Sequence, residues 1–302
     1  MHESLPVIEI ARVAHNDEPW SAGAAPFIVD GVQVGFVPPC VMAAATEYVA
    51  THPVLEVGDS LAFAAHIDTP ATRTEAIAAF VTWLRDTRRF PDPLDGWRDE
   101  RYSIYGRRDG RVVPVFELER AACGLFGVVT FGIHLTAYTA DGRIWVPQRS
   151  RTKQTWPGYL DNSVAGGITA GESVLETVVR ECEEEASLPA HIVRPALKAG
   201  GTISYFYRTS AGWHQPEMQC LPADVELKPC DGEAESFTLA DQPTIFAWLR
   251  EGRFKPNCAL GTYMLTTVLL DFFVRHGIIP RDHVDYSQLD ALLHADLRLP
   301  VP

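Results

Sequence analysis

The sequence lacks the features that mark secreted and membrane-spanning proteins. Its six cysteines include no Cys-x-x-Cys pair, which argues against a zinc site or a disulfide framework and favours a reducing compartment. The N-terminus has no basic region followed by an apolar run, so it does not predict a signal peptide. The most apolar late stretch, residues 265–274, contains Asp271 and is too short to cross a bilayer. We therefore expect a cytoplasmic protein without a membrane partner.

An excess of positive charge is also missing. The chain has 26 Lys and Arg residues against 39 Asp and Glu residues, a formal net charge of −13. Because phosphate backbones attract basic surfaces, this balance argues against nucleic acid as a partner. An anionic substrate would then need a local cationic device, either a bound metal or a cluster of Arg and Lys side chains.

The length and the composition suffice for more than one packed core. At ~150 residues per domain, 302 residues predict about two domains, and 46% hydrophobic residues are enough to bury them. We expect an N-terminal α+β domain over residues 1–118, a second domain over residues 119–280 and a C-terminal helical tail over residues 281–302. The sequence makes no prediction of the oligomeric state.

The first of these domains carries no catalytic constellation. Residues 27–36 predict two strands around an Asp-Gly turn, and residues 41–48 predict a helix. Apolar residues at helical spacing predict a second helix over residues 72–88, and residues 107–110 predict a hairpin turn. We expect a structural or substrate-capping module.

The second domain begins with strand-forming residues. Residues 125–138 and 144–147 predict two strands joined by the turn at Asp141-Gly142. Further elements are predicted towards the C-terminus: strands over residues 202–208 and 218–227, and helices over residues 243–251, 260–276 and 282–295.

A helix between these segments carries the chemistry. Five apolar residues recur at the spacing of one buried helical face, namely Leu175, Val178, Val179, Cys182 and Ala186. Ser173 followed by Glu176 predicts a capping box at the start of a helix over residues 173–186.

Three glutamates, Glu181, Glu184 and Glu185, lie within one turn of the same helix. Taken alone, they are typical of a solvated helix face. Carboxylates crowded in this way repel one another unless a divalent cation neutralises them. Oxygen ligands at this density suit Mg²⁺ or Mn²⁺ rather than zinc.

The spacing around the glutamates favours a metal site over a solvated helix face, because residues 166–188 resemble the Nudix box, G-x5-E-x7-R-E-U-x-E-E-x-G-U. Its glycine and polar positions are filled by Gly166, Glu172, Arg180, Glu181, Glu184 and Glu185. The resemblance implies a Nudix α/β/α sandwich with a mixed central sheet, preceded by the small α+β domain. It also implies a metal-dependent hydrolase acting on a small-molecule diphosphate.

The resemblance further implies a role for each matched residue. Glu181, Glu184 and Glu185 match the metal ligands, and Arg180 would hold them in register while it pairs with Glu172. Gly166 and Gly167 match the turn that approaches the metal closely. Ser187 departs from the box, which has glycine there; that residue ends the helix, where a left-handed backbone is usual. The departure puts the turn geometry in doubt rather than the metal site.

The general base is less sharply defined by the box. The acidic segment of residues 231–235 follows the last strand predicted for the domain. We favour Glu235 in it as a fourth metal ligand or base, with an acidic surface turn as the alternative.

Three further segments resemble one Nudix subfamily with an N-terminal domain of this length, which includes the Nudix half of fungal proteins fused to thiamine pyrophosphokinase. They are residues 149–153, 156–162 and 255–258, and residues 27–39 resemble the start of that domain. The resemblance implies hydrolysis of thiamine diphosphate, and preferentially of oxothiamine and oxythiamine diphosphates, to the monophosphate and phosphate.

The residues permit this substrate. Arg149, Arg151 and Lys153 can cradle a diphosphate, and Trp156 can stack on a thiazolium or pyrimidine ring. Tyr205 and Phe206 are further stacking candidates. The alternatives are solvated cations on a loop and aromatic side chains packed in the core.

Three rival functions remain to be weighed. Residues 153–162 also resemble isopentenyl diphosphate isomerase, but that enzyme needs a cysteine after the asparagine and Ser163 stands there. A nucleoside diphosphate derivative such as ADP-ribose stays open as the substrate. A non-catalytic Nudix-fold ligand sensor would be expected to have lost the glutamates that this chain keeps.

Overall fold

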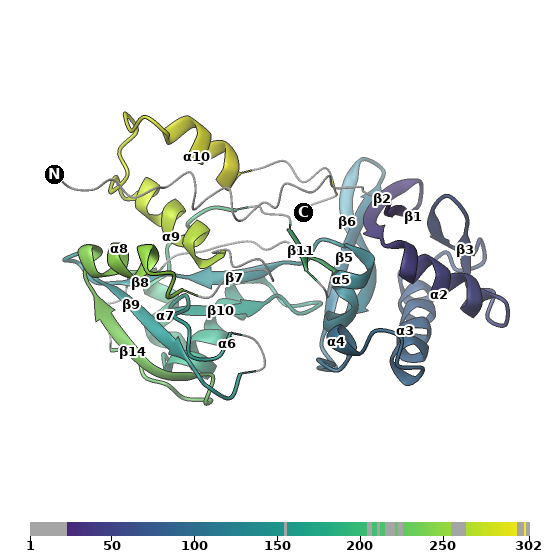
Figure 1. Cartoon of the computed structure of the whole chain (residues 1–302), viewed down its shortest axis with the longest axis horizontal. Coiled ribbons are helices and arrows are strands. Elements are labelled where there is room, and N and C mark those ends of the chain that lie inside the picture. The colour runs from purple at the N-terminus through teal and green to yellow at the C-terminus, as the bar shows by residue number, and fades with distance from the viewer. Residues whose placement is uncertain are drawn as a thin grey trace.

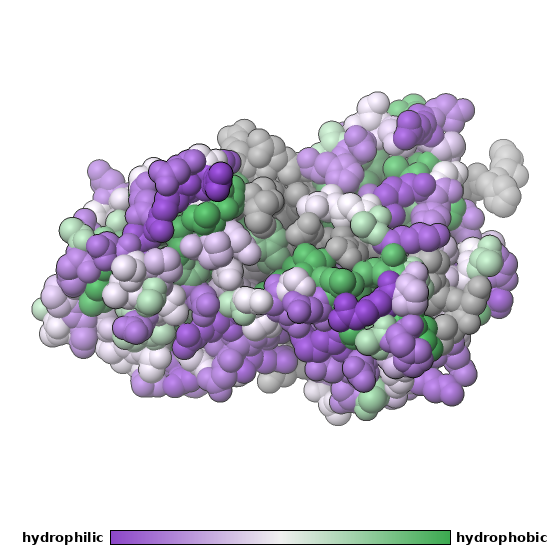
Figure 2. Space-filling view, turned by 180° about the vertical axis from the view of Figure 1, so that it is seen from behind, coloured by the Kyte–Doolittle hydropathy of each residue, from purple (hydrophilic) through white to green (hydrophobic). Residues whose placement is uncertain are grey.

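A computed structural model describes residues 23–153, 156–203, 207–209, 212–214, 221–222, 226–254, 264–294 and 299. Tyr205, Phe206 and residues 255–258, which were singled out in the sequence, lie outside the described residues. Among the helices that it describes, none is long and apolar enough to span a bilayer. The face seen in Figure 2 is mostly hydrophilic over both halves of the molecule, with hydrophobic residues gathered towards its middle.

The N-terminal half is built on two hairpins with Asp-Gly turns. Asp30-Gly31 and Asp109-Gly110 all have positive φ, as a two-residue hairpin turn requires. The first hairpin joins a four-stranded sheet in the order β2-β1-β4-β3, and the second stands alone. The elements are β1 (Ala25–Val29), β2 (Val32–Val37), α2 (Pro39–Val49), β3 (Leu55–Val57), β4 (Leu61–Phe63), α3 (Pro70–Asp86), α4 (Pro91–Leu94), β5 (Arg101–Arg108), β6 (Arg111–Glu119), η1 (Arg120–Ala122) and α5 (Cys123–Phe126).

Helices α2 and α3 cover this sheet and close an aromatic core. Phe27 lies 5.6 Å from Phe116 and 5.8 Å from Phe126, measured between ring centroids. The buried faces of α2 and α3 supply Tyr48 and Phe80 to the same core. The predicted turns and helices of this half are confirmed, and the hairpin β5–β6 stands between the two halves of the molecule (Figure 1).

One strand prediction is wrong over part of its length. Residues 125–138 were expected to form a single strand, but Leu125 and Phe126 belong to the short helix α5, which ends at Gly127 with φ of 55°. Both side chains are buried in the N-terminal core. The strand begins only at Gly132. The prediction is wrong because an apolar run does not indicate which of two cores its side chains join.

The second half is an α/β/α sandwich around a mixed sheet. Strand β9 alternates its faces: Ile144 and Val146 pack with α8 and α9, whereas Trp145 packs on the side of α6. The strands pair as β10-β7 and β13-β8-β9-β14, with β13 and β8 parallel. The elements are β7 (Gly132–Leu135), β8 (Ala137–Tyr138), β9 (Ile144–Arg149), β10 (Val164–Gly167), α6 (Val174–Ala186), α7 (Ala190–Ala196), β11 (Tyr207–Thr209), β12 (Gly212–His214), β13 (Leu221–Pro222), β14 (Ala234–Ala240), α8 (Gln242–Arg250), α9 (Met264–Arg275) and α10 (Tyr286–Leu293).

Candidate active site

Helix α6 begins and packs much as its sequence predicts. The Ser173 hydroxyl accepts a hydrogen bond from the Glu176 N–H (3.3 Å), and the Glu176 carboxylate accepts one from the Ser173 N–H (3.0 Å). Val178, Val179, Cys182 and Ala186 are buried as expected. Leu175, which was predicted to be buried, is 41% exposed. The apolar spacing predicts which face of the helix is buried, but not where along the helix its packing partners begin.

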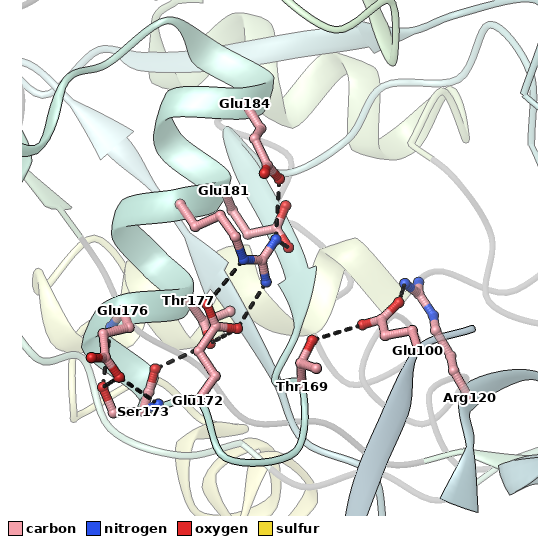
Figure 3. A network of polar contacts seen from close by, with 10 residues as sticks. Glu100, Arg120, Thr169, Glu172, Ser173, Glu176, Thr177, Glu181 and Glu184 are labelled. Atoms are coloured by element: carbon pink, nitrogen blue, oxygen red, sulfur yellow. Dashed lines mark hydrogen bonds and ion pairs between the residues drawn. The ribbon is translucent and has the colours of Figure 1, made fainter. Parts of the chain in front are cut away.

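Arg180 holds the acidic residues of the box together. Its Nε and Nη2 each donate to the Glu172 carboxylate at 2.9 Å, which braces the loop before α6 against the helix. Its Nη1 donates to Glu181 (2.8 Å) and to Glu184 (3.1 Å). Figure 3 draws this network, with Glu181 and Glu184 labelled on α6. The hydrogen bonds from Arg180 hold the pKa of Glu172 below its ordinary value, and one from the Thr177 hydroxyl (2.9 Å) adds to this effect. The guanidinium thus connects three carboxylates.

Two glycines of β10 allow a close approach to this cluster. A Cβ atom at Gly166 would collide with the Glu181 carboxylate, and one at Gly167 would collide with the hydroxyl of Tyr102. Tyr102 belongs to β5 of the N-terminal half. Gly166 therefore lets β10 lie against the acidic cluster, and Gly167 lets the N-terminal domain lie against β10.

A second carboxylate pair lies beside the first cluster. Glu185 accepts a hydrogen bond from the Ala165 N–H (3.0 Å) and shares another with Glu233, which follows the turn before β14. Burial raises the pKa of Glu181 to about 7, and burial together with the two acidic neighbours raises the pKa of Glu185. Burial acts to raise the pKa of Glu233, but the ion pair with Lys153, the hydrogen bond from Glu185 and the charge of Arg149 together outweigh burial and lower it. The site is crowded with negative charge.

A cavity of about 220 Å³ opens beside these carboxylates. Its wall in the second half of the chain includes Arg149, Lys153, Asp161, Asn162, Glu185 and Glu233. Arg149 forms an ion pair with Asp161 and Lys153 one with Glu233. Of the four substrate-binding residues predicted from the sequence, two line this cavity.

The other two do not line this cavity. Arg151 is 79% exposed and lies 3.7 Å from Glu235. Trp156 packs edge-on against Tyr159, with ring centroids 5.9 Å apart, and its carbonyl accepts from Arg149 Nε (3.1 Å). Their part in substrate binding stays a prediction from the resemblance.

The acidic segment of residues 231–235 reaches the cavity through Glu233 rather than through the favoured Glu235. Glu235 accepts a hydrogen bond from the Arg151 N–H (3.0 Å) and is not on the cavity wall, whereas Glu233 is. The pairing of β14 with β9 shifts register between Ala234 and Ser236. This bulge interrupts the alternation that would otherwise give residues 233 and 235 the same face. A bulge has no clear signal in the sequence, although the acidic segment itself was identified.

Ser187 ends α6 in the left-handed conformation, with φ of 55°. The box position that usually holds glycine therefore keeps its backbone geometry here. The hydroxyl of Ser187 donates to the carbonyl of Lys228 (3.1 Å). The departure from the box thus leaves the turn intact.

The carboxylates fit a divalent cation by their chemistry. In the part of the chain that the structure describes, no group of three His, Cys, Asp or Glu side chains is arranged to hold a metal as it stands. Glu181 and Glu184 each accept a hydrogen bond from Arg180 Nη1. The donors are carboxylate oxygens, which Mg²⁺ and Mn²⁺ prefer. Burial, with a smaller contribution from neighbouring carboxylates, raises the pKa values of Glu181 and Glu185, and a bound cation would favour their charged forms.

Two family models match the chain and meet at residue 130. Residues 130–248 match the NUDIX domain, and residues 7–130 match a domain of unknown function, DUF4743. The chain is 39% identical over 231 residues to an uncharacterized protein of Saccharomyces cerevisiae, covering 69% of this chain and 64% of that protein. It is 35% identical over 229 residues to "Nudix hydrolase 20, chloroplastic" of Arabidopsis thaliana, covering 73% and 57%. The aligned part thus spans about three fifths of the length of these relatives.

A Deinococcus radiodurans protein superposes with a TM-score of 0.41 and 19% identity, covering 52% of this chain and 93% of that one.

Proposed function

Because this chain belongs to the Nudix hydrolase family, with a DUF4743 domain before the NUDIX domain, we propose that it hydrolyses a small-molecule diphosphate with the help of a divalent metal. The substrate that we propose is thiamine diphosphate, with preference for its oxothiamine and oxythiamine analogues. The observation that carries the proposal is the group Glu181, Glu184, Glu185 and Glu233, beside a cavity that Arg149 and Lys153 also line.

The glutamates of α6 would hold Mg²⁺ or Mn²⁺. When bound, such a cation supplies charge neutralisation for the diphosphate and lowers the pKa of a coordinated water. Arg180 keeps the three carboxylates in register, and its bidentate bond to Glu172 fixes the loop that leads into the helix. Arg149 and Lys153 line the same cavity as Glu185 and Glu233 and would bind the anionic substrate, each oriented by its own carboxylate partner.

The reaction transfers a phosphoryl group to water. The water oxygen forms a bond to the terminal phosphorus, the bond from that phosphorus to the bridging oxygen breaks, and the products are the monophosphate and inorganic phosphate. We assign the acceptance of the water proton to Glu233 rather than to Glu235, because Glu233 lies on the cavity wall and contacts Glu185.

The choice of thiamine rests on the subfamily resemblance of residues 149–153 and 156–162. The cavity beside the glutamates is the size of a phosphate-binding pocket rather than that of a whole cofactor. It suits the diphosphate end of the substrate, and the organic part would extend beyond it. ADP-ribose is the alternative with the same reacting group.

Phosphate release from a panel of diphosphates tests this function. The panel contains thiamine, oxythiamine and oxothiamine diphosphates and ADP-ribose, each with Mg²⁺, with wild type, Glu184→Gln and Glu183→Gln. Glu183 is the matched control, because it is exposed on the same turn. We expect turnover of the thiamine compounds, a loss of about 10²- to 10³-fold in Glu184→Gln, and no loss in Glu183→Gln. Turnover of ADP-ribose alone contradicts the substrate, and no turnover of any compound contradicts the hydrolase.

A further inference from the structure

The cavity beside the glutamates has a second wall, which the N-terminal domain supplies. Arg98, in the loop before β5, and Arg120, directly after β6, both line the cavity. They flank the two strands at the open end of the hairpin β5–β6, where Arg101 pairs with Glu119, in a domain whose sequence shows no catalytic constellation. Two arginines from the DUF4743 domain therefore share a cavity with Glu185 and Glu233 of the NUDIX domain.

A buried carboxylate ties the two arginine-bearing loops together. Glu119 is 7% exposed, and its Oε1 accepts hydrogen bonds from the backbone N–H of Arg98 (3.1 Å) and from that of Ala121 (3.3 Å). The backbone N–H of Arg120 also donates to the carbonyl of Glu100 (2.8 Å). These bonds hold the backbone at Arg98 and at Arg120 in place, at the open end of the hairpin.

The same wall is attached to the loop of the Nudix box. Arg120 Nη1 donates to Glu100 (2.8 Å), and the hydroxyl of Thr169 donates to the other oxygen of that carboxylate (3.2 Å), as drawn in Figure 3. The Ala170 N–H donates to the carbonyl of Arg101 (2.8 Å). Thr169 and Ala170 lie between Gly166 and Glu172, so the N-terminal domain is anchored within the box itself.

The cationic side chains at and near the cavity differ in how far carboxylates already neutralise them. Arg149 and Lys153 are paired with Asp161 and Glu233, and Arg180 is shared among three glutamates. The side chain of Arg98 makes no hydrogen bond or ion pair with any residue that the structure describes. It is exposed at the cavity and can turn towards an anion without first losing a partner.

We propose that the N-terminal domain completes the substrate site, with Arg98 binding a phosphate oxygen of the diphosphate while Glu119, Glu100 and Arg120 position it. This proposal rests on the proposed function for its substrate class, but its ligand chemistry is that of any diphosphate. A guanidinium and a phosphate match in charge and in hydrogen-bonding geometry. The domain is accordingly a part of the active site rather than an independent module.

The test compares Arg98→Gln and Arg98→Lys with Arg107→Gln in the full chain. Arg107 is an exposed arginine near the far tip of the same hairpin and does not line the cavity, so it controls for net charge. Two quantities are measured: KM and kcat for thiamine diphosphate, and the affinity for inorganic pyrophosphate with Mg²⁺ by calorimetry. Because one hydrogen bond between charged groups is removed, we expect Arg98→Gln to raise KM and the pyrophosphate Kd by about tenfold or more. We expect kcat to change little, Arg98→Lys to restore part of the affinity, and Arg107→Gln to match wild type.

The two readouts separate this proposal from the function on which it rests. If no diphosphate is turned over but Arg98→Gln still weakens pyrophosphate binding, the hydrolase function fails and the arginine site stands. If turnover occurs and Arg98→Gln matches wild type in both KM and pyrophosphate affinity, the arginine site is overturned and the function stands. Absence of pyrophosphate binding by the wild-type protein also overturns the arginine site.

Discussion

Two arginines on helices, Arg73 on α3 and Arg180 on α6, each donate two hydrogen bonds to one carboxylate, but the third nitrogen of each has different partners. Arg73 is 4% exposed, and its Nη1 and Nη2 donate to Asp30. Its third nitrogen, Nε, donates a hydrogen bond to the carbonyl of Ile67 (3.3 Å), so its donors are committed to the fold. Arg180 grips Glu172 in the same way but shares its Nη1 between Glu181 and Glu184.

The difference separates an interaction that is committed to the fold from one that, under the proposed function, organises a site. A bidentate pair whose third nitrogen binds a carbonyl has nothing left to offer a ligand. A bidentate pair whose third nitrogen binds two carboxylates can release them to a cation while the brace remains. Each of the following predictions separates these two uses.

The largest effect is expected on activity when the brace of α6 is removed. Glu172→Gln weakens both hydrogen bonds from Arg180 and lets the loop before the helix move relative to the metal ligands. Outer residues that orient metal ligands are worth about 10- to 100-fold in affinity or activity. We expect a loss of phosphate release in that range, measured as kcat/KM, with a small change in melting temperature. Unchanged kcat/KM would show that the brace does not organise the site.

The corresponding change in the N-terminal domain should lower stability and leave the chemistry of the site intact. Asp30→Asn removes the charge that compensates buried Arg73. Breaking a buried pair costs about 3–5 kcal/mol, and because the Asp30 side chain is 35% exposed we expect about 2 kcal/mol. Urea unfolding measures the loss. The control is Asp86→Asn, whose pair with Arg85 is exposed and should be worth about 0–1 kcal/mol.

The same pair predicts a pH dependence of stability. The hydrogen bond from Arg73 holds the folded-state pKa of Asp30 below its ordinary value, against the opposing effect of burial. A depressed carboxyl pKa stabilises the fold above the unfolded pKa, and this contribution is lost as the pH falls through the folded pKa. The difference in unfolding free energy between wild type and Asp30→Asn should therefore be constant near neutral pH and shrink below about pH 4. A difference that grows on acidification would contradict this assignment.

The smallest effect concerns the ends of the two helices. Both are followed by a non-glycine residue with positive φ, Arg88 after α3 and Ser187 after α6. A left-handed backbone costs an ordinary residue about 1–2 kcal/mol, but Ser187→Gly also loses the bond to the carbonyl of Lys228. We expect a net gain of about 0.5 kcal/mol in urea unfolding. A net loss would mean that the Ser187 hydroxyl outweighs the backbone strain.

The parts of the site that depend on local sequence could be predicted, and the parts that depend on contacts between distant segments could not. The capping box and the register of Glu172 with Arg180 follow from residues within one segment, and both are present. The left-handed turn at Ser187, which the missing glycine put in doubt, is present as well. Glu233 and Arg98 reach the cavity from distant segments. Glu235 was favoured over Glu233 because the bulge between them has no clear signal in the sequence.

The N-terminal arginines show the same limit for a whole domain. Arg98 and Arg120 flank a hairpin and look like ordinary surface residues in the sequence. Their place on the cavity depends on the buried carboxylate of Glu119 and on the packing of Tyr102 over Gly167. Spacing alone contains no information about such docking, so the domain was expected to be a structural or capping module.

The central claim is that the glutamates of α6 bind the metal that hydrolysis requires. Its most direct test is the Mg²⁺ dependence of phosphate release from oxythiamine diphosphate by wild type and by Glu181→Gln, with Glu183→Gln as the control. We predict that the wild-type rate rises with Mg²⁺ and saturates. The Glu181→Gln rate should be lower by about 10²-fold or more at every Mg²⁺ concentration, and Glu183→Gln should follow wild type. A Glu181→Gln protein with the wild-type rate and the wild-type Mg²⁺ dependence would contradict the claim.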